Sequence, residues 1–126
     1  MMNAAMSNEL VELWTVEDLD RLLAQSSGES VLIYKHSLEC GTSGMALEEI
    51  EDLVAGPPIG ARIGVVMVQP AREVSNEIAR RFAVRHESPQ ILLVQSGRVV
   101  WHASHFRVTA ESVSSAIARA GAGVKT

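Results

Sequence analysis

Stretches of consecutive apolar residues alternate along this chain with stretches in which apolar residues recur every three or four positions. The continuous runs Val31–Tyr34 and Gly64–Val68 are typical of buried strands. Helical spacing predicts four helices, over about 16–23, 45–54, 74–82 and 110–120. Glu9–Trp14 reads as a short first strand, and Gln90–Val94 and Val99–His102 flank a Ser96-Gly97 turn that predicts a hairpin.

Residues at the ends of these segments set the expected boundaries. Thr15 begins a capping box with Asp18, the second helix starts near Gly44, and Thr109 caps the last helix. Gly56-Pro57-Pro58 ends the second helix, and Gly121 follows the last. The order β-α-β-α-β-α-β-β-α predicts one α/β domain over 1–126, with a mixed sheet, helices on both faces and short flexible ends at 1–8 and 121–126.

Composition narrows the function classes. The net charge is −4 and no basic run occurs, so nucleic acid is not an expected partner. No apolar stretch is long enough to span a membrane, and 1–9 lacks the features of a secretory signal. The chain has one cysteine, which cannot form an internal disulfide, so a reducing cytoplasm is the expected location.

That cysteine, Cys40, lies in the turn between the strand Val31–Tyr34 and the second helix. Orphan N–H groups and the macrodipole at a helix N-terminus favour a thiolate, which is the reactive form. The alternative is an ordinary buried cysteine that acts as a small apolar residue.

Two landmarks resemble the thioredoxin superfamily, whose element order this chain shares after an added strand and helix. Cys40 holds the place of the active cysteine. Ser88-Pro89, just before the hairpin, holds the place of the cis-proline that faces it in that superfamily. A plain rigid turn is the alternative role for Pro89.

Within that superfamily the chain resembles the monothiol bacilliredoxins, which work with bacillithiol. The resemblance runs from about 31 to 117, and it is carried by the stretches Lys35-His36-Ser37 with Ser43–Glu49, Val74–Ala79 with His86–Gln90, and Val100–His105 with Thr109–Ser112. The active-site pattern of that family is Thr-Cys-Pro-Ile-Ser. Here Glu39-Cys40-Gly41-Thr42-Ser43 keeps the cysteine and the serine. Gly41 gives a looser turn than proline, and a carboxylate at Glu39 would disfavour a thiolate if it pointed toward the sulfur.

The resemblance implies a monothiol oxidoreductase that removes bacillithiol, or a similar small thiol, from protein mixed disulfides. Cys40 would be the nucleophile, and Ser43 would stabilise its thiolate by a hydrogen bond or would cap the helix. Gly41, Thr42, Ser88 and Pro89 would bind substrate, with the backbone of Ser88 pairing with an extended chain. The partners would be S-thiolated proteins and the small thiol, with no tightly bound cofactor.

Other polar residues receive simpler interpretations. Lys35 is expected to be exposed at a strand end rather than to add charge at the site. The four histidines, His36, His86, His102 and His105, could tune proton transfer, but His102 and His105 are not expected to converge on a metal, so no metal site is predicted. Trp101 is expected to pack against the sheet.

Two other functions remain open from the residues. Cys40-Gly41-Thr42-Ser43 resembles the Cys-Gly-Phe-Ser of monothiol glutaredoxins, which bridge an iron–sulfur cluster with glutathione, although Thr42 replaces the aromatic and the expected glycine-rich loop is absent. A non-catalytic thioredoxin-like binding module, recruiting a partner through Ser88-Pro89, is the other alternative.

Overall fold

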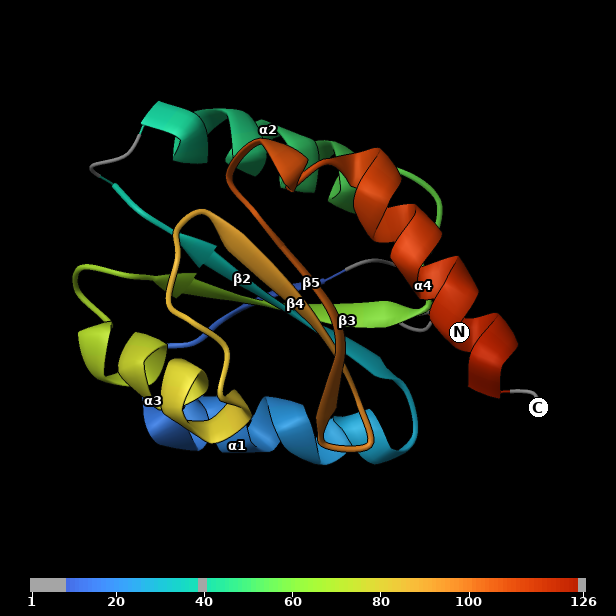
Figure 1. Cartoon of the computed structure of the whole chain (residues 1–126), viewed down its shortest axis with the longest axis horizontal. Coiled ribbons are helices and arrows are strands. Elements are labelled where there is room, and N and C mark those ends of the chain that lie inside the picture. Colours follow the sequence, from blue (N-terminus) through green and yellow to red (C-terminus); the bar gives the residue numbers. More distant parts are fainter. Residues whose placement is uncertain (1–8, 39–40, 125–126) are drawn as a thin grey trace.

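A computed structural model describes residues 9–38 and 41–124 as one five-stranded mixed sheet covered by helices on both faces (Figure 1). The elements are β1 (Leu10–Glu12), α1 (Val16–Ala24), η2 (Gln25–Ser27), β2 (Ser30–His36), α2 (Gly41–Ala55), β3 (Ala61–Met67), α3 (Arg72–Phe82), β4 (Gln90–Gln95), β5 (Arg98–Ser104), η3 (His105–Arg107) and α4 (Ala110–Val124). This order confirms the predicted succession of strands and helices.

The strand order is β1-β3-β2-β4-β5. The strands β1, β3 and β2 run parallel to one another, since their connections are helical crossovers. β4 runs antiparallel to β2, and β5 runs antiparallel to β4. Both residues of the β4–β5 turn, Ser96 and Gly97, have positive φ, which matches the twist that a two-residue hairpin needs. β2 is central and is buried along its whole length.

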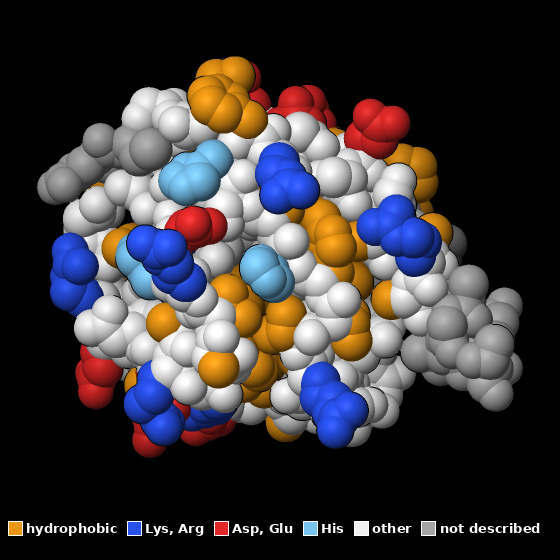
Figure 2. Space-filling model, viewed as in Figure 1, with side chains coloured by type: hydrophobic (Ala, Val, Ile, Leu, Met, Phe, Trp, Pro, Cys, Tyr) orange, Lys and Arg blue, Asp and Glu red, His pale blue; other side chains and the backbone are white. Residues whose placement is uncertain are grey.

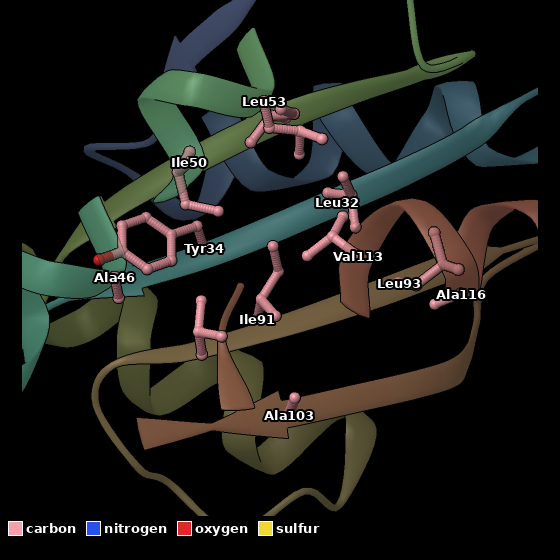
Figure 3. Close-up of a cluster of buried hydrophobic side chains, with 12 residues drawn as sticks. Leu32, Tyr34, Ala46, Ile50, Leu53, Ile91, Leu93, Ala103, Val113 and Ala116 are labelled. Atoms are coloured by element: carbon pink, nitrogen blue, oxygen red, sulfur yellow. The ribbon is translucent and has the colours of Figure 1, made fainter. Parts of the chain in front are cut away.

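Side chains of β2 point alternately to the two faces of the sheet, so each face has its own hydrophobic core. Leu32 and Tyr34 face α2 and α4, where they pack with Ile50, Leu93 and Val113 (Figure 3). On the other face, Val31 and Ile33 pack against α1 and α3 through a cluster that includes Leu19, Leu22, Val74 and Ile78. Trp101 packs against the first cluster, as predicted.

Most helix boundaries follow the signals in the sequence. Thr15 and Asp18 form the predicted capping box of α1, and α2 ends at Ala55, just before Gly56. Thr109 caps α4 by accepting the N–H of Ser112 at 3.1 Å. The predicted end at Gly121 is wrong, because α4 continues to Val124. Gly121 and Gly123 both lie inside the helix, where glycine lowers helix propensity without ending the helix. The predicted flexible end at 1–8 and the last two residues lie outside the described part of the chain.

Candidate functional site

The candidate site lies where β2 ends and α2 begins. Cys40 and Glu39 fall outside the described residues, and α2 starts directly after them at Gly41. The predicted start near Gly44 is therefore wrong by three residues. Gly41, Thr42 and Ser43 are weak helix formers, and burial of Ser43 against the end of β2 overrides that preference. Gly41 is exposed and Thr42 is half-buried.

Ser43 is fully buried and is bonded to the segment that precedes the cysteine. Its Oγ accepts the backbone N–H of Ser37 at 3.1 Å. The predicted capping role is wrong, because Ser43 is the third residue of α2 and its oxygen serves a donor outside the helix. A hydroxyl has one proton to donate in addition, so this contact leaves the Ser43 O–H available for another acceptor.

Tyr34 and His36 lie on the face of β2 that packs against α2, the helix that contains Ser43. Tyr34 Oη donates to the carbonyl oxygen of Ser43 at 3.3 Å and lies 3.0 Å from Nδ1 of His36. Burial lowers the pKa of His36, so its imidazole is neutral at pH 7. Nothing in the sequence distinguished Tyr34 from an ordinary core residue, although the spacing of two places it on the same face as His36.

Gln69 is a second residue that the sequence did not indicate. Its side chain accepts the N–H of Leu38 at 3.0 Å and donates to Ser37 Oγ at 2.9 Å. Both bonds hold Ser37 and Leu38, the last described residues before α2, to the segment that follows β3. Gln69 therefore fixes the end of the described segment that precedes α2.

The expectation for Lys35 is wrong. Its side chain is fully buried on the face of β2 that is opposite to Tyr34 and His36. Nζ lies 3.1 Å from the carbonyl oxygen of Ser75 and 3.1 Å from Nδ1 of His86. Burial lowers the pKa of Lys35 to about 8. β2 continues to His36, so Lys35 lies inside the sheet and not at its exposed end.

The Ser88–Pro89 segment lies beside the end of β2. Its peptide bond is cis, Pro89 is buried and Ser88 is half-buried. Gln90, the next residue, pairs with Lys35 in β2, and the Pro89 carbonyl accepts the N–H of His105 at 2.9 Å. The structure thus brings Ser88 and Pro89 to the same end of the sheet as Ser43.

Two further observations cover all of the described residues, one on metal binding and one on membrane-spanning helices. Within residues 9–38 and 41–124, no group of three or more His, Cys, Asp and Glu side chains is arranged to hold a metal ion. None of the helices in these ranges is both long and apolar enough to cross a membrane.

Comparison with known proteins adds the family. The model of the family described as monothiol bacilliredoxin BrxC matches residues 11–113. The chain belongs to the monothiol bacilliredoxin family. The matched range contains Cys40, Ser43 and Pro89, and membership supports a redox role at a thiol.

Solved structures agree on the fold. A protein described as an oxidoreductase with a thioredoxin fold is 24% identical, with a TM-score of 0.75 over 85% of this chain and 92% of that one. Fasciola hepatica thioredoxin is 18% identical, with a TM-score of 0.70 over 86% and 97% of the two chains. Thioredoxin from Trypanosoma brucei brucei is 12% identical, with a TM-score of 0.74 over 97% and 99%. At these identities the likeness establishes the thioredoxin fold alone, which confirms the predicted fold class.

Proposed function

We propose that this chain is a monothiol thiol–disulfide oxidoreductase that removes bacillithiol, or a similar small thiol, from protein mixed disulfides. Cys40 is the nucleophile in this proposal, the protein partners are S-thiolated proteins, and a small thiol is the co-substrate with no tightly bound cofactor. We place the reaction in the cytoplasm, where thiols are kept reduced.

The observation that carries the proposal is the family match around a single cysteine. A dithiol enzyme of this fold would have a resolving cysteine three residues after the nucleophile. This chain has Ser43 there, fully buried and held by the N–H of Ser37. A serine cannot form a disulfide, so the second half of the reaction requires an external thiol.

The reaction consists of two exchanges. The Cys40 thiolate attacks the sulfur of the small thiol in the mixed disulfide, forms a new S–S bond with it and expels the protein thiolate, which takes a proton from water. The thiolate of a second small thiol then attacks the small-thiol sulfur bound to Cys40. That step releases a symmetrical small-molecule disulfide and regenerates the Cys40 thiolate, so no other oxidant or reductant is needed.

Residues around the cysteine have supporting roles in this proposal. The Ser43 O–H donates to the Cys40 thiolate and lowers its pKa. Gly41 and Thr42, in the first turn of α2, and Ser88 with Pro89, in the facing loop, contact the substrate. The Pro89 carbonyl accepts the N–H of His105, which holds the loop in place, and Ser88 is half-buried. This arrangement suits a strand-like contact between the backbone of Ser88 and an extended peptide.

Mass spectrometry of the purified protein, incubated with a bacillithiolated substrate protein, tests the function. Wild type is expected to gain the mass of one bacillithiol, while Cys40→Ala gains none and retains the same circular dichroism spectrum. Ser43→Ala keeps the adduct but forms it more slowly at neutral pH, because its Cys40 pKa, followed by thiolate absorbance, is higher. A folded wild type that takes up no adduct would contradict the proposal and favour a non-catalytic binding module.

A second variant tests the monothiol route. In Ser43→Cys the new thiolate can attack Cys40 in its adduct, form an internal disulfide and release the small thiol. The adduct should then be short-lived in Ser43→Cys and persistent in wild type when no second small thiol is added. Equal persistence in both proteins would contradict the assignment of Ser43 to the place of a resolving thiol.

A further inference from the structure

The loop between α3 and β4 contains the cis-proline and is held at both of its ends. Near its start, the carbonyl oxygen of Arg85 accepts a hydrogen bond from Gln90 Nε2 at 3.0 Å. At its other end, the Pro89 carbonyl accepts the N–H of His105 at 2.9 Å. The loop passes beside the carboxyl end of β2 (Figure 1). Its middle, just before Ser88, is held by a different group.

That group is Lys35, which is fully buried beneath the loop. Its Nζ lies 3.1 Å from Nδ1 of His86 and 3.1 Å from the carbonyl oxygen of Ser75. An ammonium donates and cannot accept, so Nδ1 of His86 is the acceptor and the ring proton lies on Nε2. His86 is itself exposed, and histidine side chains reach the surface among basic side chains on the face drawn in Figure 2. The imidazole therefore joins a buried cation to a surface loop.

The polar layer beneath the loop costs stability. No carboxylate of the described residues lies within 4 Å of Lys35 Nζ. Gln90 lies opposite Lys35 on β4, and its buried Oε1 has no hydrogen-bond partner in the described part of the chain. A buried cation without a counterion and a buried amide oxygen without a donor are both unfavourable. Such departures are expected at functional sites, and this one lies directly beneath Ser88-Pro89.

Lys35 also connects the two halves of the proposed site. It belongs to β2, and Cys40 follows it by five positions in the sequence. Its partner His86 precedes Ser88 by two positions. One buried side chain thus joins the strand that leads to the nucleophile to the loop that is proposed to bind substrate.

We propose that Lys35 is a positioning residue, which through His86 holds Ser88 where its backbone pairs with an S-thiolated protein. The inference rests on the proposed function and specifies how the protein partner is recognised, through extended backbone beside its modified cysteine. A small disulfide has no such backbone, so its exchange with Cys40 does not require the loop in this position. The contact therefore separates protein mixed disulfides from small-molecule disulfides.

The rate of adduct formation on Cys40 tests this separation. Mass spectrometry follows the rate at increasing concentrations of a bacillithiolated substrate protein and, separately, of bacillithiol disulfide. Lys35→Met should raise the half-saturating concentration of the protein about tenfold, as loss of one charge-assisted hydrogen bond does, with the maximal rate and the rate with bacillithiol disulfide unchanged. Arg98→Met, which removes an exposed cation, should change neither. Equal losses with both substrates, or no loss with either, would overturn the assignment.

His86→Ala removes the same contact from its exposed side and leaves the buried lysine in place. It should raise the half-saturating concentration of the protein substrate as Lys35→Met does, and it supplies the test if Lys35→Met does not fold. The double variant should show no larger rise than the single variants, because both act through one hydrogen bond. Additive rises would contradict the coupling of Lys35 to His86.

Titration of Lys35 provides a readout that a purely structural contact would not change. Burial lowers the pKa of Lys35 to about 8, and the amine that forms above this pH donates a weaker hydrogen bond to His86. The other charged groups that act on His86 are Arg72 of α3 and Glu87 of the loop. The ratio of the rate constants for the protein and for bacillithiol disulfide cancels the titration of Cys40, because both reactions use the same thiolate.

This ratio should fall between about pH 7 and 9 in wild type and stay constant in Lys35→Met. The same pH dependence in both proteins would overturn the positioning of the loop by Lys35.

The two proposals fail separately. Titration of Cys40→Ser with the bacillithiolated protein measures binding without thiol exchange, and Lys35→Met in this background should raise the Kd about tenfold. That rise, together with no adduct on wild-type Cys40, would overturn the oxidoreductase function alone. Adduct formation by wild type, together with the same Kd with and without Lys35, would overturn the positioning role alone.

Discussion

Lys35 Nζ lies 3.1 Å from Nδ1 of His86, in the layer between the sheet and α3. The pKa of His86 is lowered by burial first and then by the charges of Lys35 and Arg72, while Glu87 opposes the shift. The neutral imidazole can therefore accept a proton from the ammonium. The contact joins the central strand to the segment that leads into Ser88-Pro89, so a buried cation helps to fix the loop beside the candidate site.

Burial of Lys35 gives stability a pH dependence. Its pKa is about 8 in the folded protein and 10.5 in the unfolded chain, so between these values the unfolded chain binds more protons. The free energy of unfolding of wild type should therefore rise with pH in that window, relative to Lys35→Met, by at most about 3 kcal/mol at about 1.4 kcal/mol per pKa unit. Below pH 8 the difference between the two proteins should be constant.

Urea unfolding of both proteins at about pH 7, 8.5 and 10 measures this difference. Arg98→Met, which removes an exposed cation from the hairpin, serves as the control and should show no such change against wild type. A constant difference between wild type and Lys35→Met across the whole range would show that the lysine is not buried as a titrating cation.

Ser43→Ala should destabilise the junction of β2 and α2. The N–H of Ser37 loses its acceptor at a buried position, which costs about 1–3 kcal/mol. Amide hydrogen exchange at Ser37 should become faster than in wild type. Ser115→Ala, an exposed change in α4, is the matched control and should be neutral or slightly stabilising. Unchanged protection of the Ser37 amide in Ser43→Ala would contradict the hydrogen bond.

The fold was largely predictable because its signals are local. Continuous apolar runs mark the central strands, and spacings of three and four mark the helices, whichever neighbours they later contact. Lys35 shows where local reasoning fails. A lysine after four apolar residues resembles a strand end, whereas pairing with β3 and β4 extends β2 through Lys35 and buries it. That outcome depends on Ser75 and His86, which are 40 and 51 residues away in sequence.

For the candidate site, the structure shows Ser43 and Pro89 at the same end of the sheet, while Cys40 lies outside the described residues and its role stays a prediction. Cys40, Ser43 and Pro89 were proposed from their places relative to strands and helices together with their resemblance to the thioredoxin superfamily and the monothiol bacilliredoxins. The contacts that hold the segments around these residues were not predicted, because Gln69 reaches Ser37 only through the pairing of β2 with β3. Likewise, Pro89 meets His105 only once the hairpin has formed.

Two glycines should respond to alanine in opposite ways. A Cβ at Gly64 in β3 would lie 2.5 Å from Leu22 Cδ2 and 2.8 Å from Leu13 Cδ1, so Gly64→Ala overpacks the core and should cost about 1–3 kcal/mol. A Cβ at Gly44 in α2 meets no atom within 4 Å, so Gly44→Ala should stabilise the helix by about 0.5–1 kcal/mol. Thermal unfolding compares the two, and equal effects would contradict the close approach at Gly64.

Glu49, a residue of α2, caps the first turn of α4 with its side chain. Its Oε1 accepts the N–H of Ala110, the first residue of α4, at 2.8 Å. A carboxylate at a helix N-terminus is stabilising, so Glu49→Gln should lower the free energy of unfolding by about 0.3–1 kcal/mol at low salt and by less at high salt. Glu48→Gln, the exposed neighbour, is the control and should change it little. Equal losses in both variants would mean that net charge, and not this contact, determines the effect.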